Sequence, residues 1–531
     1  MAYDYIIVGA GSAGCVLANR LSANPDVRVL LLEAGGRDSN FWIKVPAGYV
    51  KTMDNPAVNW LFQTTPDPKT GNRAIPVPRG RTLGGSSSIN GMIYVRGQAL
   101  DYDTWAQLGN RGWSYQDVLP YFKKSQHREE ASTDYHGVDG PLNVRELDER
   151  HPLMDALIDA GEAIGVPRNP DYNGATQEGF GYFQVTHKNG QRHSAADAYL
   201  HPISGRANLQ IETHAQVERI DFDGRRATGV TYRQHGKTHA ELAGREVILA
   251  AGAIQSPQLL ELSGVGDATR LSELGIPVVH HLPGVGENLQ DHYIVRVVWQ
   301  INQPFTLNEQ LRGPSLVREV AKYMFGRRGA LTLTPGVVYG FVKSRPELAG
   351  PDIQYHTAHA SFANPAKRVL DRVPGLTIGP CQLRPESRGS VHATTSNPFA
   401  APAIAPNFLD ALVDQQTQIA GVRIARSLGA TAALGRYITE ERVPGSGCDT
   451  DDEILDFVRS TGATVYHPVG TCKMGSDPMA VVDDQLRVHG IAGLRVVDAS
   501  IMPTLTSGNT NAPAIMIGEK GADLILDAPA R

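Results

Sequence analysis

Two loops near the C-terminus of this 531-residue chain contain side chains that could handle a proton and a polar oxygen. His467 lies in YHPVGTCKMG and Asn511 lies in NTNAP, and each has a proline within two residues. An imidazole is a natural base near neutral pH, whereas an amide can hold an oxygen atom but cannot accept its proton. The chain has 17 histidines, most of which must be surface or packing residues, so His467 alone does not identify an active site.

A second chemical signal lies at the other end of the chain, in DYIIVGAGSAG. The apolar residues 3–8 are typical of a buried parallel strand, and the segment CVLANRLSA after the glycines is typical of a helix. A GxGxxG turn between a strand and a helix can bind phosphates, because free N–H groups and the helix dipole favour anions. We therefore expect a nucleotide to contact Gly9, Gly11, Ser12, Ala13 and Gly14.

Glu33 strengthens this interpretation. It ends the second apolar strand, VRVLLLEAG, and follows Gly14 by 19 residues, a distance at which a carboxylate can accept hydrogen bonds from a ribose. Gly9 permits the tight turn, Gly11 lets the backbone approach a pyrophosphate, and Gly14 lets the helix and strand pack closely. The motif does not distinguish FAD from NAD.

The segment PRGRTLGGSSSINGMIYVRG, residues 78–97, favours a flavin. Gly84 and Gly85 are followed by three serines, and together they offer many N–H and hydroxyl donors to a bulky polar ring system. Taken alone, the segment is equally typical of a surface loop.

Two further segments, AAGAIQSPQLLELSGVG (250–266) and GVGENLQDH (284–292), extend the pattern along the whole chain. With the segments above, they make the chain resemble the glucose–methanol–choline (GMC) family of flavin-dependent alcohol oxidoreductases. Within the family, it is most similar to the bacterial choline dehydrogenase-like and aliphatic alcohol dehydrogenase branch. The resemblance implies FAD as the cofactor.

The resemblance also implies a two-domain fold. An α/β, Rossmann-like FAD-binding domain would comprise residues 1–155, 196–300 and 462–531. An α+β substrate domain around a six-stranded antiparallel sheet would comprise residues 156–195 and 301–461. Segments such as PDIQYHTAHA and RGSVHATTSNP have the strand-and-turn character that such a sheet requires.

Residue roles follow from the same resemblance. His467 matches the family's catalytic base, and Asn511 matches a second active-site position that holds the substrate oxygen. Val217 matches the position whose backbone contacts the adenine. The expected FAD contacts also include Gly84, Gly85, Asn90, Met92, Asp498 and Ala499.

Two departures from relatives refine these expectations. Ile89 stands where some members carry a histidine bonded covalently to the flavin, so we expect non-covalent FAD. Val337 aligns with a carboxylate that faces the quaternary ammonium in choline-specific members, so we expect Val337 to line a pocket that disfavours choline. An acid elsewhere in the substrate domain, such as Glu347 or Asp352, could still supply that charge.

Composition excludes several other classes. With 50 basic and 55 acidic residues, the chain has no basic field for nucleic acid. The four cysteines are scattered, and His280, His281 and His292 lack metal-site spacing, so we expect no metal and place these histidines in a buried turn. No apolar run reaches about 18 residues, which argues against a membrane span.

The start of the chain leaves no room for a signal peptide before the first strand. We therefore expect a cytoplasmic location, and peripheral contact with the inner membrane stays open, as does a homodimer.

These observations predict FAD-dependent oxidation of a non-cationic primary alcohol, aliphatic, polyol or sugar alcohol, to the aldehyde. The hydride would pass to flavin N5 with help from His467, and a quinone- or dye-type acceptor would take the electrons. An oxidase that uses O2 and a choline dehydrogenase are the alternatives within the family. A non-catalytic FAD-binding protein is the alternative from another class.

Overall fold

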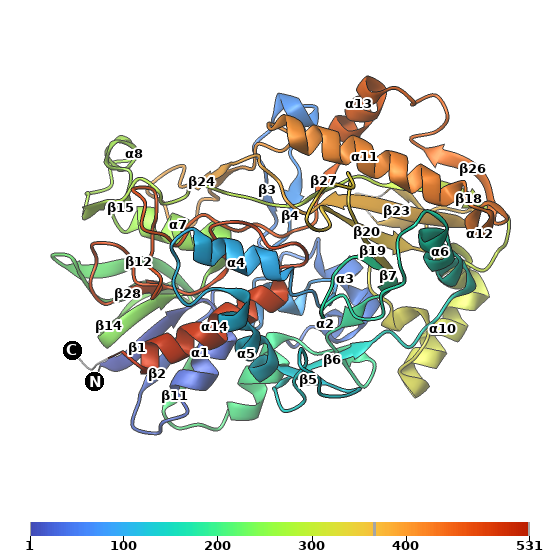
Figure 1. The fold of residues 1–531 in the computed structure, drawn as a ribbon. Helices are drawn as coiled ribbons and strands as arrows, with labels where there is room; N and C mark the ends of the chain where they lie inside the picture. Colours follow the sequence, from blue (N-terminus) through green and yellow to red (C-terminus); the bar gives the residue numbers. More distant parts are fainter. Residues whose placement is uncertain (1, 365–367, 529–531) are drawn as a thin grey trace.

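Two β-sheets, each with its own hydrophobic core, organise the chain (Figure 1). The computed structural model describes residues 2–364 and 368–528. The mainly parallel sheet lies near both chain ends, and the antiparallel sheet lies at the other end of the molecule. This confirms the expected combination of a Rossmann-like α/β unit with an antiparallel sheet.

The first sheet has the strand order β11-β2-β1-β14-β13-β12, with β28 beside β14. Five strands, β11, β2, β1, β14 and β28, pair in parallel, and β12 to β14 form an antiparallel meander. Strand β2, VLLL, is buried throughout, as expected for a strand covered on both faces. The strands are β1 (Tyr3–Val8), β2 (Val29–Leu32), β11 (Leu209–Glu212), β12 (Ala215–Asp223), β13 (Arg226–Gln234), β14 (Lys237–Leu249) and β28 (Leu494–Val496).

Helices from both ends of the sequence pack beside this sheet. Figure 1 shows the C-terminal helix α14 (Asn511–Leu526) alongside α1 (Ser12–Leu21). Glycine permits this approach, because a Cβ atom on Gly518 would lie 3.0 Å from the Ala13 Cα atom. The NTNAP segment therefore lies beside the nucleotide-binding turn, where Asn511 accepts a hydrogen bond from the Ser12 hydroxyl. A third helix, α7 (Gly252–Leu262), follows strand β14.

The second sheet has the antiparallel order β26-β18-β23-β20-β19-β7 and includes two short strands, β17 and β27. Both β17 and β27, and most of β18, fall in ranges assigned from the sequence to the FAD-binding domain, so this sheet extends across the expected boundaries at 300 and 462. The strands are β7 (Gly179–Tyr182), β17 (Tyr293–Ile294), β18 (Val297–Ile301), β19 (Val338–Val342), β20 (Ile353–Ala358), β23 (Gly375–Gln382), β26 (Ile438–Val443) and β27 (Ala463–Thr464).

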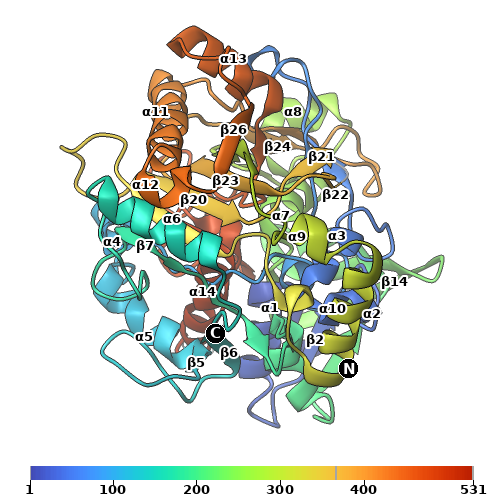
Figure 2. The same cartoon turned by 90° about the vertical axis from the view of Figure 1, so that its right-hand side faces the viewer.

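The two faces of the second sheet have different neighbours. Helices α6 (Pro152–Ala163) and α11 (Leu412–Gly429) cover one face, and α13 (Asp451–Thr461) packs on α11 (Figure 2). Tyr355 points to this side and donates a hydrogen bond to the Gly421 carbonyl oxygen of α11. Its neighbour His356 and the alternate residue Ala358 line a cavity on the opposite face. The alternation therefore gives the sheet one packed face and one functional face.

The remaining elements are short or peripheral. Within the described ranges, no helix has the length and apolar character needed to cross a membrane. The helices are α2 (Phe41–Lys44), α3 (Tyr49–Thr52), α4 (Ala99–Gln107), α5 (Tyr115–Ser125), α8 (Ala268–Glu273), α9 (Leu307–Gln310), α10 (Gly313–Gly326) and α12 (Ala432–Gly435). The small strands are β3 (Phe62–Gln63), β4 (Pro76–Val77), β5 (Gln126–Arg128), β6 (Leu142–Glu146), β8 (Gln184–Val185), β9 (His187–Lys188), β10 (Gln191–Arg192), β15 (Val265–Gly266), β16 (His280–His281), β21 (Phe362–Asn364), β22 (Val369–Leu370), β24 (Ser390–His392) and β25 (Ala403–Ala405).

Candidate active site

A cavity of ≈ 400 Å³ joins the two units. Its nucleotide half is bounded by the glycine turn, Glu33, β12 and the start of α7, and its substrate half by the second sheet and the loop of His467. Most residues expected to bind FAD or to act in catalysis line this one cavity: Gly9, Gly11, Ser12, Ala13, Glu33, Gly85, Asn90, Met92, Val217, His467, Asp498, Ala499 and Asn511.

The nucleotide half has the geometry that FAD requires. Gly9 has φ +101°, which suits glycine, and a Cβ atom on Gly11 would meet only the Ala250 carbonyl oxygen, at 3.8 Å, so the turn is open to a pyrophosphate. The two oxygens of Glu33 accept hydrogen bonds from the N–H groups of Ala10 (3.0 Å) and Gly35 (2.8 Å). Burial raises the pKa of Glu33 to about 7, although the two hydrogen bonds act to lower it. Each oxygen keeps a lone pair for a ribose hydroxyl.

Asp498 fixes the C-terminal loop to the nucleotide half. Its carboxylate accepts hydrogen bonds from the Gly252 N–H (2.9 Å), the Ser256 hydroxyl (2.6 Å) and the Ser500 N–H (2.8 Å). Gly252 and Ser256 belong to α7, whereas Ser500 follows strand β28. Because these donors already occupy the carboxylate, we infer that Asp498 shapes the site by joining two segments far apart in the sequence.

The flavin-side segment is held by Arg192. Its guanidinium donates to the Asn90 side-chain oxygen and to the Asn90 carbonyl oxygen, both at 2.7 Å. The Asn90 side chain in turn accepts from the Met92 N–H (3.0 Å), and Met92 has the unusual φ of +61°. The loop therefore has a fixed shape at the cavity wall.

Two of the expected glycine contacts have structural roles instead of lining the cavity. A Cβ atom on Gly14 would lie 1.9 Å from the Gly9 carbonyl oxygen, which agrees with the expected close helix–strand packing. Gly84 has φ +82°, and a Cβ atom there would lie 2.3 Å from the Ser88 hydroxyl. Both glycines are needed for backbone shape next to the cavity.

His467 is held between two polar groups in the substrate half. Its Nδ1 atom lies 3.0 Å from Nδ1 of His292, and the two rings are nearly perpendicular, at 89°. Its Nε2 atom lies 3.1 Å from the Asn509 side-chain nitrogen. The Asp291 carboxylate accepts hydrogen bonds from the backbone N–H groups of His292 and His467, both at 2.8 Å. These bonds hold the loops of the two histidines together.

The hydrogen bonds determine which nitrogen of His467 carries a proton. His292 Nε2 lies 3.1 Å from the Leu383 carbonyl oxygen, so this nitrogen must donate. In a neutral His292, Nδ1 is then an acceptor, and His467 Nδ1 must donate to it. The lone pair of His467 is therefore on Nε2, where the Asn509 amide donates to it. This is the tautomer that a base facing the cavity requires.

The surroundings also keep His467 neutral. Burial and the nearby His292, His356 and Arg79 side chains lower its pKa well below 6.5. Burial lowers the pKa of His292 to about 4. Both rings are therefore unprotonated at pH 7, as proton removal from an alcohol requires.

The sequence does not single out two residues of this constellation, His292 and Asn509. It predicts a buried turn at His292, which lies next to Asp291 within GVGENLQDH. Asn509 precedes Asn511 by two residues, and Gln354 donates to its oxygen at 3.2 Å, which orients its amide toward His467. Asn511 lies nearer the nucleotide turn, where its oxygen accepts from the Ser12 hydroxyl (2.7 Å).

Val337 differs from the expectation that it lines the pocket. It is fully buried in the core of the second sheet and is not among the cavity-lining residues, and the same segment reaches the cavity at Pro335. Its backbone instead bonds to Phe183 and Thr357. Ile89, in contrast, does line the cavity.

Comparison with known proteins agrees with this geometry. The model of the GMC oxidoreductase N-terminal domain matches residues 3–294, and that of the C-terminal domain matches residues 385–518. The chain belongs to the GMC oxidoreductase family. It is therefore an FAD-dependent oxidoreductase whose homologues act on alcohols, and the nucleotide half described above fits that cofactor.

Relatives of this GMC oxidoreductase carry different substrate names. The chain is 45% identical to an alcohol dehydrogenase [acceptor] of Pseudomonas putida, covering 99% of this chain and 96% of that protein. It is also 45% identical to an oxygen-dependent choline dehydrogenase of Escherichia coli, covering 99% and 94%. The crystal structure of pyridoxine 4-oxidase from Mesorbium loti superposes with a TM-score of 0.90 at 31% identity, over 99% of this chain and 100% of that one.

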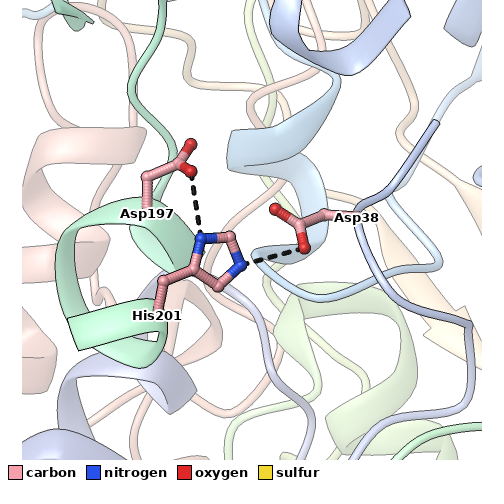
Figure 3. A group of neighbouring side chains, drawn as sticks. All are labelled: Asp38, Asp197 and His201. Carbon is pink, nitrogen blue, oxygen red and sulfur yellow. Dashed lines mark hydrogen bonds and ion pairs between the residues drawn. The ribbon is translucent and has the colours of Figure 1, made fainter. Parts of the chain in front are cut away.

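One group of side chains in the described ranges could geometrically hold a metal ion. Figure 3 shows His201 between Asp38 and Asp197, outside the central cavity. Lys44 also pairs with both carboxylates, so two cationic groups already occupy the space that a metal ion would need. Hydrogen bonds to Asp197 and Asp38 raise the pKa of His201 to about 9, although burial acts to lower it. We interpret this group as a structural ion-pair network.

Proposed function

We propose that this GMC oxidoreductase oxidises a non-cationic primary alcohol to the aldehyde and passes the electrons to a quinone- or dye-type acceptor. One observation carries the proposal: a buried, neutral His467 whose Nε2 lone pair faces the cavity. A group of this kind can take the hydroxyl proton of an alcohol at neutral pH.

The chain's own side chains account for binding and proton transfer. The alcohol hydroxyl donates to His467 Nε2, displacing the Asn509 amide, and the oxygen that loses its proton can accept from the Asn509 or Asn511 amide. FAD, when bound, supplies the acceptor for the hydride that leaves the alcohol carbon. The His467 residue is only 8% exposed, so bulk water competes little for the proton.

The charges around the cavity disfavour a cationic substrate. Among described residues, the carboxylates that line the cavity are Glu33 and Asp498, both in the nucleotide half and both bonded to backbone N–H groups. A trimethylammonium group would lose its hydration without gaining a counter-charge. This supports the non-cationic assignment independently of Val337.

The acceptor assignment follows the 45% identity to the alcohol dehydrogenase [acceptor]; because the oxygen-dependent choline dehydrogenase is equally identical, the acceptor has to be decided by experiment. The competing oxidase and choline dehydrogenase activities are tested together. Anaerobic addition of primary alcohols should bleach the flavin's visible absorbance, which a non-catalytic FAD-binding protein would not do. Turnover should then be supported by a quinone-like dye with little peroxide formed in air. Faster turnover of choline than of any neutral alcohol would refute the proposal.

A further inference from the structure

Three guanidinium groups face the substrate half of the cavity: Arg79, Arg296 and Arg368. All three act on Tyr466, the residue that precedes His467. Arg79 donates a hydrogen bond to the Tyr466 carbonyl oxygen (2.5 Å). Burial raises the pKa of Tyr466, and the charges of Arg296 and Arg368 act to lower it. The two active-site loops and the second sheet thus gather positive charge beside His467.

Two of these arginines already have protein partners. Arg79 also donates to the Pro78 carbonyl oxygen (2.7 Å), and burial lowers its pKa to about 10, so it is still charged at pH 7. Arg368 pairs with Asp54. Their charges contribute to the field in the cavity. Arg79 has acceptors for two of its nitrogens, and Arg368 is held by Asp54, although its buried Nε atom has no hydrogen-bond partner among the described residues.

Arg296 has no such partner. Across residues 2–364 and 368–528, its guanidinium makes no hydrogen bond and no ion pair, although the residue is only half-exposed and lines the cavity. A guanidinium has five N–H donors, and leaving them without acceptors in a confined site is unfavourable. Arg296 is therefore the cavity-lining arginine whose guanidinium has no acceptor at all among the described residues, and an anion in the cavity could supply one.

The position of Arg296 in the sheet agrees with its place in the cavity wall. The register that pairs Ile294 with Cys381 and Val297 with Ile378 places Arg296 opposite Gly379 and on the same face as Ile294, which also lines the cavity. Gly379 in turn pairs with His356. Burial lowers the pKa of His356 to about 3, and the charge of Arg296 contributes to this shift. His356 in turn helps to lower the pKa of His467. Arg296, His356 and His467 all line the same cavity.

The acidic groups nearby do not neutralise Arg296. Asp291 accepts from two backbone N–H groups and from the Thr464 hydroxyl, behind the histidine pair. Asp54 is paired with Arg368. His356 is neutral, and its Nε2 atom is buried with no hydrogen-bond partner among the described residues, so it could donate to an anion as well.

We propose that Arg296 binds the carboxylate of the substrate, and that the alcohol oxidised by this enzyme is a hydroxy carboxylate whose hydroxyl end reaches His467. This proposal rests on the proposed alcohol oxidation. A planar guanidinium matches the two oxygens of a carboxylate, and the pair would offset the uncommitted charge. The carboxylate takes no part in the reaction: the hydroxyl proton goes to His467, the hydride goes to FAD, and the carbon becomes an aldehyde.

The test compares matched substrates on the holoenzyme. A series of ω-hydroxy carboxylates of increasing length is assayed against the ω-hydroxy amides and hydroxyalkyl phosphates of the same lengths. We expect kcat/KM for the best carboxylate to exceed that of its amide by about tenfold or more, the scale of one charge-assisted hydrogen-bonded pair. An amide or a phosphate that matches or exceeds the carboxylate at every length would overturn the assignment.

Substitutions locate the effect. Arg296→Gln should raise KM for the carboxylate by about tenfold or more while leaving the amide almost unchanged, and Arg296→Lys should recover part of the loss. Arg345→Gln, in an exposed segment away from the cavity, is the matched control. FAD content checks folding. An equal loss of kcat on carboxylate and amide would show that Arg296 acts on the cofactor and would contradict the proposal.

The two proposals fail differently. If neutral alcohols bleach the flavin but the carboxylates have no advantage, only the role of Arg296 is wrong. If no alcohol of any charge bleaches the flavin, the proposed function is wrong.

Discussion

The Nδ1 atoms of His292 and His467 lie 3.0 Å apart, and this contact connects two loops that are 175 residues apart in the sequence. Because the Leu383 carbonyl oxygen requires a proton on His292 Nε2, the contact places the His467 proton on Nδ1 and its lone pair on Nε2. His292 is thus a positioning residue: it touches the base and determines the base's tautomer.

Replacing His292 should therefore slow flavin reduction without removing FAD. We expect His292→Leu to lower the reduction rate by about tenfold or more, a fraction of what a general base contributes. His292→Gln, whose amide oxygen can still accept from His467, should recover part of the rate. Anaerobic stopped-flow measurement checks both variants.

A purely structural role for His292 would give a different pattern. The acid limb of the pH profile should move to higher pH in His292→Leu, because His292 helps to lower the pKa of His467. His281→Leu, on an exposed strand of the same region, is the control and should show neither change. A slower His292→Leu enzyme with an unmoved pH profile would indicate lost packing alone.

The low pKa of His467 predicts how the wild-type rate depends on pH. The base form is present above the pKa, which burial and neighbouring charges hold well below 6.5. The rate of flavin reduction at saturating alcohol should thus be flat from about pH 8 to about pH 6.5 and fall only at lower pH. An acid limb with an apparent pKa of about 7 or above would show that His467 is protonated more easily than its surroundings suggest.

Ile89 predicts how the cofactor is held. It lines the cavity where some relatives carry a histidine bonded to the flavin, and its side chain cannot form such a bond. Denaturation in acid should therefore release all the flavin into the supernatant. Yellow colour that stays with the precipitated protein would reveal a covalent bond to another residue.

His392 predicts a pH dependence of stability that is separate from catalysis. Burial alone would lower its pKa, but hydrogen bonds to Glu261 (2.7 Å) and Glu287 (2.9 Å) outweigh it and raise the pKa to about 9. Because the pKa of His392 is higher in the folded protein than in the unfolded one, the charged imidazole stabilises the fold. This stabilisation is fully present below about pH 6.5 and is lost as the pH rises through about 9.

The apparent Tm of the wild type should therefore fall, relative to that of His392→Gln, by a few degrees between about pH 6.5 and 9. Scanning calorimetry of the two proteins at matched FAD content measures the difference. The same slope in both proteins would mean that His392 is not charged in the folded state.

The nucleotide half could be predicted closely from the sequence because its information is local. The strand, the glycine turn and Glu33 lie within 33 residues, and each glycine has a steric reason that the structure bears out at Gly9 and Gly14. The proposed base, His467, could be predicted because its loop, YHPVGTCKMG, resembles the family segment that carries the catalytic base. These features need no knowledge of how distant segments pack.

The substrate half could not be predicted in the same way, because its key contacts join distant segments. His292 meets His467 only through the pairing of β17 with β27, and Arg296 faces the cavity only through the register of β18 with β23. The resemblance to choline-specific members predicts Val337 at the pocket, but the segment reaches the cavity at Pro335, two residues earlier. Side-chain direction in such a segment depends on the tertiary structure.

The most direct test of the account replaces the base itself. In an anaerobic stopped-flow experiment, His467→Ala and the wild type are mixed with the best primary alcohol, and flavin absorbance is followed at pH 7. We predict that the variant keeps its FAD but reduces it about a hundredfold or more slowly, the usual scale of general base catalysis. Reduction at the wild-type rate would contradict the assignment of His467 as the base.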